Sequence, residues 1–319
     1  MTILDKREAF TPFEYPKAYE FWQQQQSADW KPWDIKYGED VSDWATMPES
    51  HKRIVGGVLR GFTQTELLVN EYWSTYVKSW FPKPEIALMC SCFASMEGIH
   101  AVSYNQLSET LGLDTYSEFK SDPAAQAKLG YLLDIDSTNP TLHQKARSLA
   151  IFSAFTEGVS LFSSFAILQY FSTKNQLKGV GDVIKYSILD EGKHSEAGIW
   201  LYRQLLSEYP VVDTIELRTE VEEGARAVVQ LEHSFIDSVF SSGGIEGLEA
   251  EDIKAFISVR ANIKLRELGY DDLFDYNRQA ADNILSWFNI LNIGADRTDF
   301  FATLPTYATI EVPEIDWDF

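Results

Sequence analysis

Two copies of a Glu-x-x-His motif are the residues whose types and spacing best suit chemistry in this chain. They are Glu97-Gly98-Ile99-His100 and Glu191-Gly192-Lys193-His194. At 3.6 residues per helical turn, positions three apart lie on one face, so each motif presents a carboxylate and an imidazole to the same point. Two such pairs, with one acid from each of two further helices, form the ligand set of a dinuclear metal site in a helix bundle. Glu66 and Glu157 are placed to supply those two acids.

Glu157 is the acid whose surroundings give most weight to this interpretation. It lies in the most apolar stretch of the chain, with no Lys or Arg near it in sequence. Burying an unpaired carboxylate is costly, so such an acid needs a positive partner. Four glutamates and two neutral histidines carry four negative charges, which two divalent cations offset. Because oxygen-rich ligands suit iron or manganese, the pattern predicts a pair of transition-metal ions.

Two further side chains lie close to these motifs in sequence. Tyr104 is seven residues after Glu97 and returns to almost the same helix face, where its phenol could be oxidised, hydrogen-bond a ligand or simply pack. Asp190 directly precedes Glu191 and is a candidate for an acid that orients a ligating histidine. The alternative for Asp190 is an ordinary solvated helix acid.

The elements that must position these residues are helices. The sequence predicts a short helix through Tyr19 to Gln26 and long helices near 50–80, 84–112, 140–173, 178–208, 213–241 and 250–269. The aromatic stretch 30–44, broken by Pro32 and Gly38, is expected to be a loop packed on the body. Residues 1–290 are thus expected to form one helical domain, and residues 291–319 a flexible tail.

Composition excludes several classes of protein. The chain has 319 residues, 27 basic and 48 acidic, with a formal charge of −21, so we expect no nucleic-acid partner. Cys90 and Cys92 stand two apart in an expected helix, which suits neither a disulfide nor a zinc site. We therefore expect free thiols in a cytoplasmic protein without a signal peptide.

One segment, Ser148 to Phe171, meets the length criterion for a membrane span, since Glu157 is its only charge. It is rich in Ser and Thr, and no second such segment is expected. A helix buried on all sides in a bundle explains it better, so no membrane association is expected.

The chain resembles the small, radical-generating subunit of class I ribonucleotide reductases over nearly its whole length. The matching spacings are 31 residues from Glu66 to Glu97, three to His100, four to Tyr104, and 34 from Glu157 to Glu191. Asp190-Glu191-x-x-His194 matches the family's Asp-Glu-x-x-His. The resemblance implies an all-α, ferritin-like helix bundle with a dinuclear metal site in its core, and six metal ligands: Glu66, Glu97, His100, Glu157, Glu191 and His194.

The resemblance extends to both ends of the chain. Trp30, in Trp30-Lys31-Pro32, matches the tryptophan that the family uses as an electron relay at the surface nearest the metals. Tyr307 stands where the family keeps a tyrosine in its mobile tail, and Asp316-Trp317-Asp318-Phe319 resembles the tail end of the shorter, bacterial subtype.

The function implied by this resemblance is that of a ribonucleoside-diphosphate reductase beta subunit. The metal pair holds an oxidising equivalent, which passes by way of Trp30, Asp190 and Tyr307 to a cysteine in a separate catalytic subunit that makes deoxyribonucleotides. The implied partners are that large subunit, docked through the tail, and a second copy of the chain in a homodimer.

Some positions depart from the common tyrosyl-radical members, which carry Asp at the first ligand position where this chain has Glu66. Leu161 and Ser187 stand where those members surround the tyrosine with larger apolar groups, and a hydroxyl near the phenol would favour quenching of a radical. Glu66 together with Tyr104 resembles a subgroup that keeps the oxidising equivalent on a dimanganese centre. We therefore favour Mn/Mn, with Fe/Fe or Mn/Fe as alternatives, and a dioxygen-derived oxidant, superoxide being favoured.

Two other functions remain open from the sequence. A stand-alone di-metal oxidase or hydroxylase of the same fold would need a substrate pocket but neither the Trp30 relay nor the aromatic tail. A non-enzymatic bundle for metal storage or as a scaffold is the third interpretation.

Overall fold

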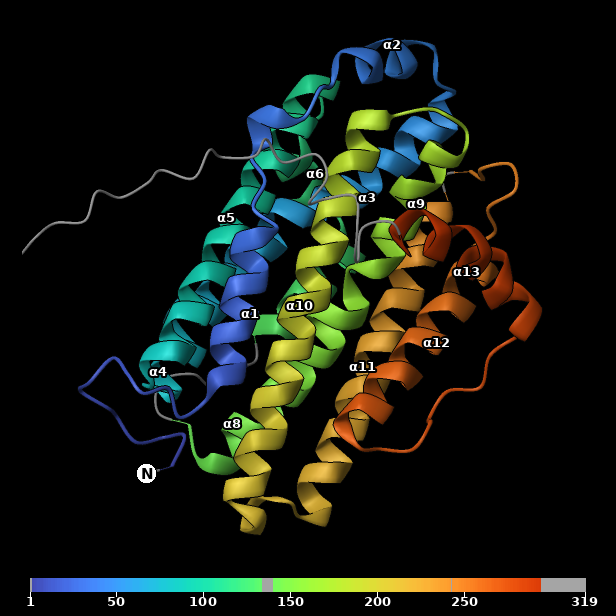
Figure 1. Ribbon diagram of the computed structural model, residues 1–319. Coiled ribbons are helices and arrows are strands. Elements are labelled where there is room, and N and C mark those ends of the chain that lie inside the picture. The colour runs from blue at the N-terminus through green and yellow to red at the C-terminus, as the bar shows by residue number, and fades with distance from the viewer. Residues whose placement is uncertain (1, 134–139, 242, 294–319) are drawn as a thin grey trace, which may run out of the picture.

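Long helices with axes roughly along one direction make up the body of the protein in a computed structural model, which describes residues 2–133, 140–241 and 243–293 (Figure 1). The α-helices are α1 (Pro16–Ser27), α2 (Gly38–Thr46), α3 (Glu49–Glu71), α4 (Lys78–Trp80), α5 (Pro84–Leu111), α6 (Thr115–Lys120), α7 (Pro123–Leu133), α8 (Leu142–Leu149), α9 (Phe162–Thr173), α10 (Lys178–Glu208), α11 (Ile215–Phe240), α12 (Ala250–Leu268) and α13 (Arg278–Ile293). Two π-helical segments, η2 (Tyr72–Val77) and η3 (Ala150–Ser160), and two short 3₁₀ segments, η1 (Pro32–Asp34) and η4 (Pro210–Val212), complete the described elements. The predicted all-α, ferritin-like fold is confirmed.

Helix α8, the π-helix η3 and α9 form one continuous rod through the centre of the bundle. It begins at a capping box, in which the Thr141 side chain accepts from the backbone N–H of Gln144 and the Gln144 side chain accepts from that of Thr141. Its most apolar window is completely buried in protein. Helix α5 is also long and apolar enough to cross a membrane, so the expectation of a single such segment was wrong. Both are buried core helices, with 61% of the window in α5 covered.

A close helix crossing brings η3 against α10. A Cβ atom at Gly198 would overlap the side chain of Ser153, so only glycine lets the two backbones approach this closely. Since η3 carries Glu157 and α10 carries Glu191 and His194, this crossing sets the separation of three of the predicted ligands.

The predicted long helices agree with the structure to within a few residues, but one segment was predicted wrongly and three helices were missed. The stretch 30–44, predicted as a loop, contains η1 and most of α2, because Pro32 opens a helical turn and Gly38 begins a helix. The buried carboxylate of Asp40 in α2 accepts hydrogen bonds from the N–H groups of Gly179 and Val180 at the start of α10. Helices α6 and α7 were missed, as was α13, whose buried side chains pack on α9 and α12.

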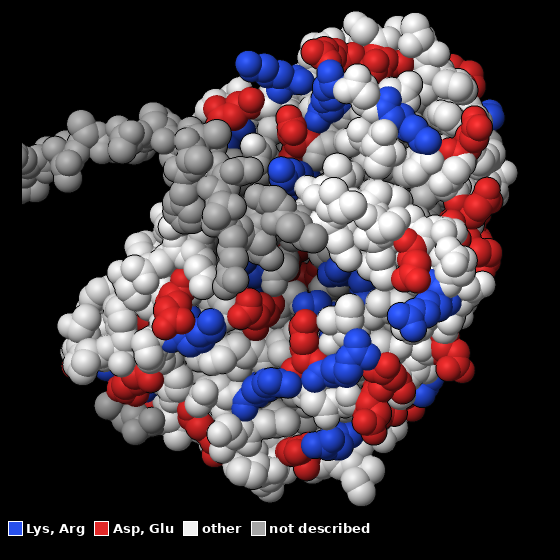
Figure 2. Space-filling model, turned by 45° about the vertical axis from the view of Figure 1, so that its right-hand side comes forward, with Lys and Arg blue, Asp and Glu red and all other residues white. Residues whose placement is uncertain are grey.

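Acidic and basic side chains share the surface. On the face that Figure 2 presents, the Lys and Arg residues that the structure describes are interspersed among Asp and Glu. The described residues on this face form no single basic region.

Candidate metal centre

The six predicted ligands meet at the middle of the bundle. They come from four elements, α3, α5, η3 and α10, and every one of them has no exposed surface. Their oxygen and nitrogen atoms fall into two groups whose members lie within 4.8 Å of one another. The first group is Glu66, Glu97, His100 and Glu191, and the second is Glu97, Glu157, Glu191 and His194. Glu97 and Glu191 belong to both groups, as bridging carboxylates of a dinuclear site would.

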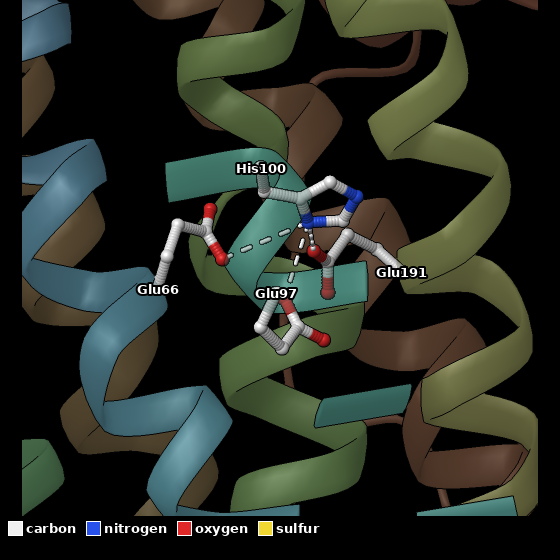
Figure 3. A group of neighbouring side chains, drawn as sticks. All are labelled: Glu66, Glu97, His100 and Glu191. Atoms are coloured by element: carbon white, nitrogen blue, oxygen red, sulfur yellow. Dashed lines mark hydrogen bonds and ion pairs between the residues drawn. The ribbon is translucent and has the colours of Figure 1, made fainter. Parts of the chain in front are cut away.

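In the first group, three carboxylates converge on one imidazole nitrogen (Figure 3). Nδ1 of His100 lies 3.1 Å from Oε2 of Glu97, 3.2 Å from Oε1 of Glu191 and 3.7 Å from Oε2 of Glu66. Glu66 reaches in from α3 and Glu191 from α10, on opposite sides of the α5 residues. A single nitrogen cannot satisfy three carboxylates, so this point needs a further positive charge.

In the second group, Nδ1 of His194 lies 2.6 Å from Oε1 of Glu97, without the geometry of a hydrogen bond. Glu157 is held from behind, because the indole N–H of Trp73 donates to its Oε1 over 2.6 Å. The ring of Phe93 lies 4.2 Å, centre to centre, from the His194 imidazole and fixes its plane. The π-helical turn of η3 carries Glu157, as such turns often do at functional sites.

Burial and mutual repulsion would keep this cluster from holding four negative charges on its own. Burial raises the pKa of Glu66 and of Glu191 to about 8. Burial and the charges of Glu191 and Glu97 also raise the pKa of Glu157 well above its usual range. Glu97 differs, since its contacts with His194 and His100 outweigh burial and hold its pKa well below the usual range. The metal-free cluster therefore binds protons at sites that a cation would take.

The donor set fits a pair of divalent cations. Eight side-chain atoms of the six residues lack a hydrogen-bond partner although they are buried: both carboxylate oxygens of Glu66 and of Glu191, Oε1 of Glu97, Oε2 of Glu157 and both ring nitrogens of His194. Buried polar atoms are normally satisfied, so unsatisfied ligand atoms gathered in two groups suit the binding of two cations. Carboxylate and imidazole donors suit iron and manganese.

Asp190 connects the cluster to Trp30. Its Oδ2 lies 3.2 Å from Nε2 of His100 and accepts the indole N–H of Trp30 over 2.9 Å, while Oδ1 accepts from the side chain of Gln25 over 2.7 Å. Hydrogen bonding from His100 outweighs burial and lowers the pKa of Asp190, so the carboxylate stays charged. In turn, Asp190 and the neighbouring glutamates outweigh burial and raise the pKa of His100 well above its usual range.

Trp30 is buried, with 4% of its surface exposed, rather than lying openly at the surface. Its ring stacks on two others, with centroids 5.9 Å from that of His100 and 5.3 Å from that of Tyr186. Tyr186 is half-buried.

Tyr104 is fully buried, with its ring 6.3 Å from that of His100 and 4.5 Å from that of Phe62. Its hydroxyl donates to Oγ of Ser187 over 2.7 Å, and not to any of the six predicted ligands. Leu161 is buried at the junction of η3 and α9.

Three residues at this site were not predicted from the sequence: Gln25, Trp73 and Tyr186. Trp73 had a signal, since it is seven residues after Glu66 and repeats the spacing of Tyr104 after Glu97. Gln25 contacts Asp190 and Tyr186 contacts Trp30, and no local sequence pattern indicates either contact. Tyr307 and the tail residues 315–319 lie outside the described residues.

Comparison with known proteins decides the family. The family model for the ribonucleotide reductase small chain matches residues 7–281. The chain belongs to the ribonucleotide reductase small-chain family. A probable ribonucleoside-diphosphate reductase small subunit of Invertebrate iridescent virus 3 is 32% identical over 95% of this chain and 85% of its own length. The beta subunit of ribonucleoside-diphosphate reductase 2 of Escherichia coli is 24% identical over 95% of both chains.

Solved reductase subunits share the fold. The subunit from Clostridium botulinum superposes with a TM-score of 0.82 at 17% identity, over 92% of this chain and 94% of that one. Dimanganese(II)-NrdF of Streptococcus sanguinis gives a TM-score of 0.77 at 23% identity, over 88% of this chain and 96% of that one. The protein is thus a ribonucleotide reductase small subunit with the dinuclear carboxylate metal site of that family, which favours the reductase over the stand-alone oxidase and scaffold interpretations.

Proposed function

We propose that this small subunit holds two metal ions through Glu66, Glu97, His100, Glu157, Glu191 and His194 and supplies the oxidising equivalent for deoxyribonucleotide synthesis. The two metal ions, when bound and oxidised, would supply one oxidising equivalent to the catalytic subunit. His100 would hold one metal ion and His194 the other, and Glu97 and Glu191 are the two residues that belong to both ligand groups. The two groups of converging, unsatisfied ligand atoms support this assignment.

The observation that carries the proposal is the hydrogen-bonded line from His100 through Asp190 to Trp30. Asp190 fixes the His100 ring and accepts the indole proton, so it can stabilise positive charge on Trp30 when that ring gives up an electron. Trp30 in turn oxidises Tyr307 in the tail, and Tyr307 oxidises a cysteine of the catalytic subunit. A stand-alone oxidase would have no use for this line.

We infer a dimanganese centre, with Fe/Fe or Mn/Fe as the alternatives, activated by superoxide or another dioxygen-derived oxidant. Glu66 at the first ligand position supports this, as does the hydrogen bond from Tyr104 to Ser187, which ties the phenol to a hydroxyl instead of isolating it. The dimanganese protein of Streptococcus sanguinis has the same fold. Tyr104 then neither holds the oxidising equivalent nor binds a metal.

The proposed partners are the catalytic subunit, docked through residues 291–319, and a second copy of the chain. Leu67 on α3 and Val102 on α5 support a homodimer, because both are more than half exposed on adjacent helices. The proposed compartment is the cytoplasm, without nucleic-acid or membrane partners.

The test is turnover of a ribonucleoside diphosphate by the metal-loaded protein mixed with a catalytic subunit, comparing Trp30→Phe with Trp287→Phe. Trp287 is a partly buried tryptophan on α13 that contacts Tyr170 and Phe288, away from Asp190. Trp30→Phe should keep two metals and lose turnover. Trp287→Phe should keep two metals and full turnover. Full turnover of Trp30→Phe would show that the oxidising equivalent leaves by another route.

A further inference from the structure

A second set of aromatic residues touches the metal centre on the Glu157 side. The indole N–H of Trp73 donates to Glu157, and its ring lies 6.2 Å, centre to centre, from the imidazole of His194. Trp73 is completely buried. Trp73 therefore donates its indole N–H directly to a member of the second ligand group, whereas Trp30 donates to Asp190, which in turn lies beside His100 of the first group.

From Trp73 an unbroken series of rings continues outward. The ring of Tyr72 lies 5.7 Å from that of Trp73 and 6.0 Å from that of Trp80, and the rings of Trp80 and Tyr76 stack at 6.5 Å with 20° between their planes. We call Trp73, Tyr72, Trp80 and Tyr76 the 72–80 aromatic chain. All four belong to one segment, η2 with α4, and α4 lies at the end of the bundle opposite α2 (Figure 1). The series therefore leads away from Trp30, which precedes η1 and α2.

The outer end of this chain suits proton-coupled oxidation. Tyr76 is partly exposed, and its hydroxyl donates to Oε1 of Glu71 over 2.9 Å. An oxidised phenol releases its proton, and the Glu71 carboxylate is in position to take it. Tyr72 differs, since its hydroxyl is buried and accepts from Ser148, and burial raises its pKa. Tyr72 thus serves as a bridge between two indoles, and Tyr76 as the terminus.

We propose that the 72–80 aromatic chain conducts electrons inward from the surface at Tyr76, so that a metal centre oxidised without its partner is discharged before its ligands are damaged. This rests on the proposed function, because it requires an oxidised centre. Trp73 gives one electron to the centre, and the vacancy moves through Tyr72 and Trp80 to Tyr76. Tyr76 gives one electron inward along the aromatic chain and its proton to Glu71. A small soluble thiol then gives one hydrogen atom to the tyrosyl radical and becomes a thiyl radical, and Glu71 returns its proton to water.

Residue types distinguish this inference from simple core packing. Phe152 stacks on Tyr72 at 3.7 Å and Phe93 meets Trp73 edge-on at 5.1 Å, so phenylalanine fills the neighbouring positions. The through-going positions hold only Trp and Tyr, the readily oxidised aromatic side chains. The buried indole N–H of Trp80 has no hydrogen-bond partner in the described structure, which lowers the stability of the fold. A polar contact therefore does not explain a tryptophan at this position.

The experiment follows the oxidised, metal-loaded protein alone, with neither partner nor substrate. We compare wild type, Trp80→Phe, Tyr76→Phe and the control Trp287→Phe, measuring decay of the oxidised centre by electron paramagnetic resonance and spin-trapped residues by mass spectrometry. Wild type and Trp287→Phe should be trapped at Tyr76 and decay alike. Trp80→Phe should lose the Tyr76 adduct, decay several-fold more slowly and accumulate oxidation products on Trp73, and Tyr76→Phe should decay more slowly too. Equal decay in all four proteins, or a Tyr76 adduct undiminished in Trp80→Phe, would overturn the proposal.

A second arm needs no metal and so separates this proposal from the proposed function. Lys78 is exposed in α4, and Lys78→Cys can carry a ruthenium photo-oxidant, since Cys90 and Cys92 are both buried. A laser flash on the metal-free protein should produce a tryptophan radical at Trp73, and Trp80→Phe should abolish it. An identical flash signal with and without Trp80→Phe would show that the 72–80 aromatic chain does not carry the electron. If the flash result holds while the metal-loaded protein forms no oxidised centre, it is the proposed function that fails.

Discussion

The hydroxyl of Tyr104 donates to Oγ of Ser187 over 2.7 Å, in a site where neither side chain has exposed surface. A lasting phenoxyl radical needs surroundings that neither supply nor remove protons. A serine hydroxyl at this distance does both, so this contact argues against Tyr104 as the store of the oxidising equivalent.

Tyr104→Phe should therefore keep most of its turnover with the catalytic subunit. Removing the hydroxyl leaves Ser187 without a partner in the core, which should lower the free energy of unfolding by about 1 kcal/mol. The oxidised wild type should give a multi-line manganese signal in electron paramagnetic resonance. A narrow phenoxyl line in the wild type together with an inactive Phe variant would instead place the protein among the tyrosyl-radical subunits.

Glu157→Ala should lower metal content and turnover together, because it removes a ligand of the second group. The matched control is Glu232→Ala, since Glu232 is also fully buried but pairs with Lys128 at 2.7 Å, outside both ligand groups. The control should lose stability yet retain two metals per chain by elemental analysis. Two metals retained in Glu157→Ala would contradict the ligand assignment.

The metal-free protein should become less stable as pH rises. Folding raises the pKa of Glu66 and Glu191 from 4.5 to about 8, so each contributes stability that is complete at low pH and is lost as pH rises through 8. The raised pKa of His100 acts in the same direction above 6.5. The upper limit is about 1.4 kcal/mol per pKa unit for each group.

This pH dependence can be followed by urea unfolding of the metal-free protein between about pH 5.5 and pH 8.5. Most of this window lies between the usual glutamate pKa of 4.5 and the raised pKa of about 8. Saturating manganese should remove most of the slope, because the cations replace the protons. Glu66→Gln should reduce the slope without metal. A metal-free protein whose stability rose over this window would show that the cluster is not protonated.

The tail should dock the catalytic subunit. Deleting residues 315–319 removes an aromatic, acidic end suited to ordering on binding, and it should abolish complex formation while metal content stays at two. Sedimentation of the mixed subunits measures this, with Tyr307→Phe as the companion variant. That variant should bind the catalytic subunit normally and lose turnover. Unchanged affinity after the deletion would place the docking surface on the helical body.

The long helices and the six cluster residues could be predicted because their signal is local. A Glu-x-x-His spacing places two side chains on one helix face, whatever the rest of the chain does. An isolated acid such as Glu157 in an apolar helix indicates a buried charge. Other features depend on contacts between distant segments. Gln25 reaches Asp190 across 165 positions, and α2 forms around Asp40, which caps the start of α10 from 139 positions away. The pattern of 30–44 alone, with Pro32 and Gly38, therefore predicted a loop.

The six residues are expected to hold two metal ions at the two points where their ligand atoms converge. Anomalous scattering at the manganese and iron absorption edges, from crystals of protein loaded in cells, tests it most directly. Two peaks are expected, one beside Nδ1 of His100 and one beside Nδ1 of His194, both strong at the manganese edge. A single peak, or peaks away from Glu97 and Glu191, would contradict it.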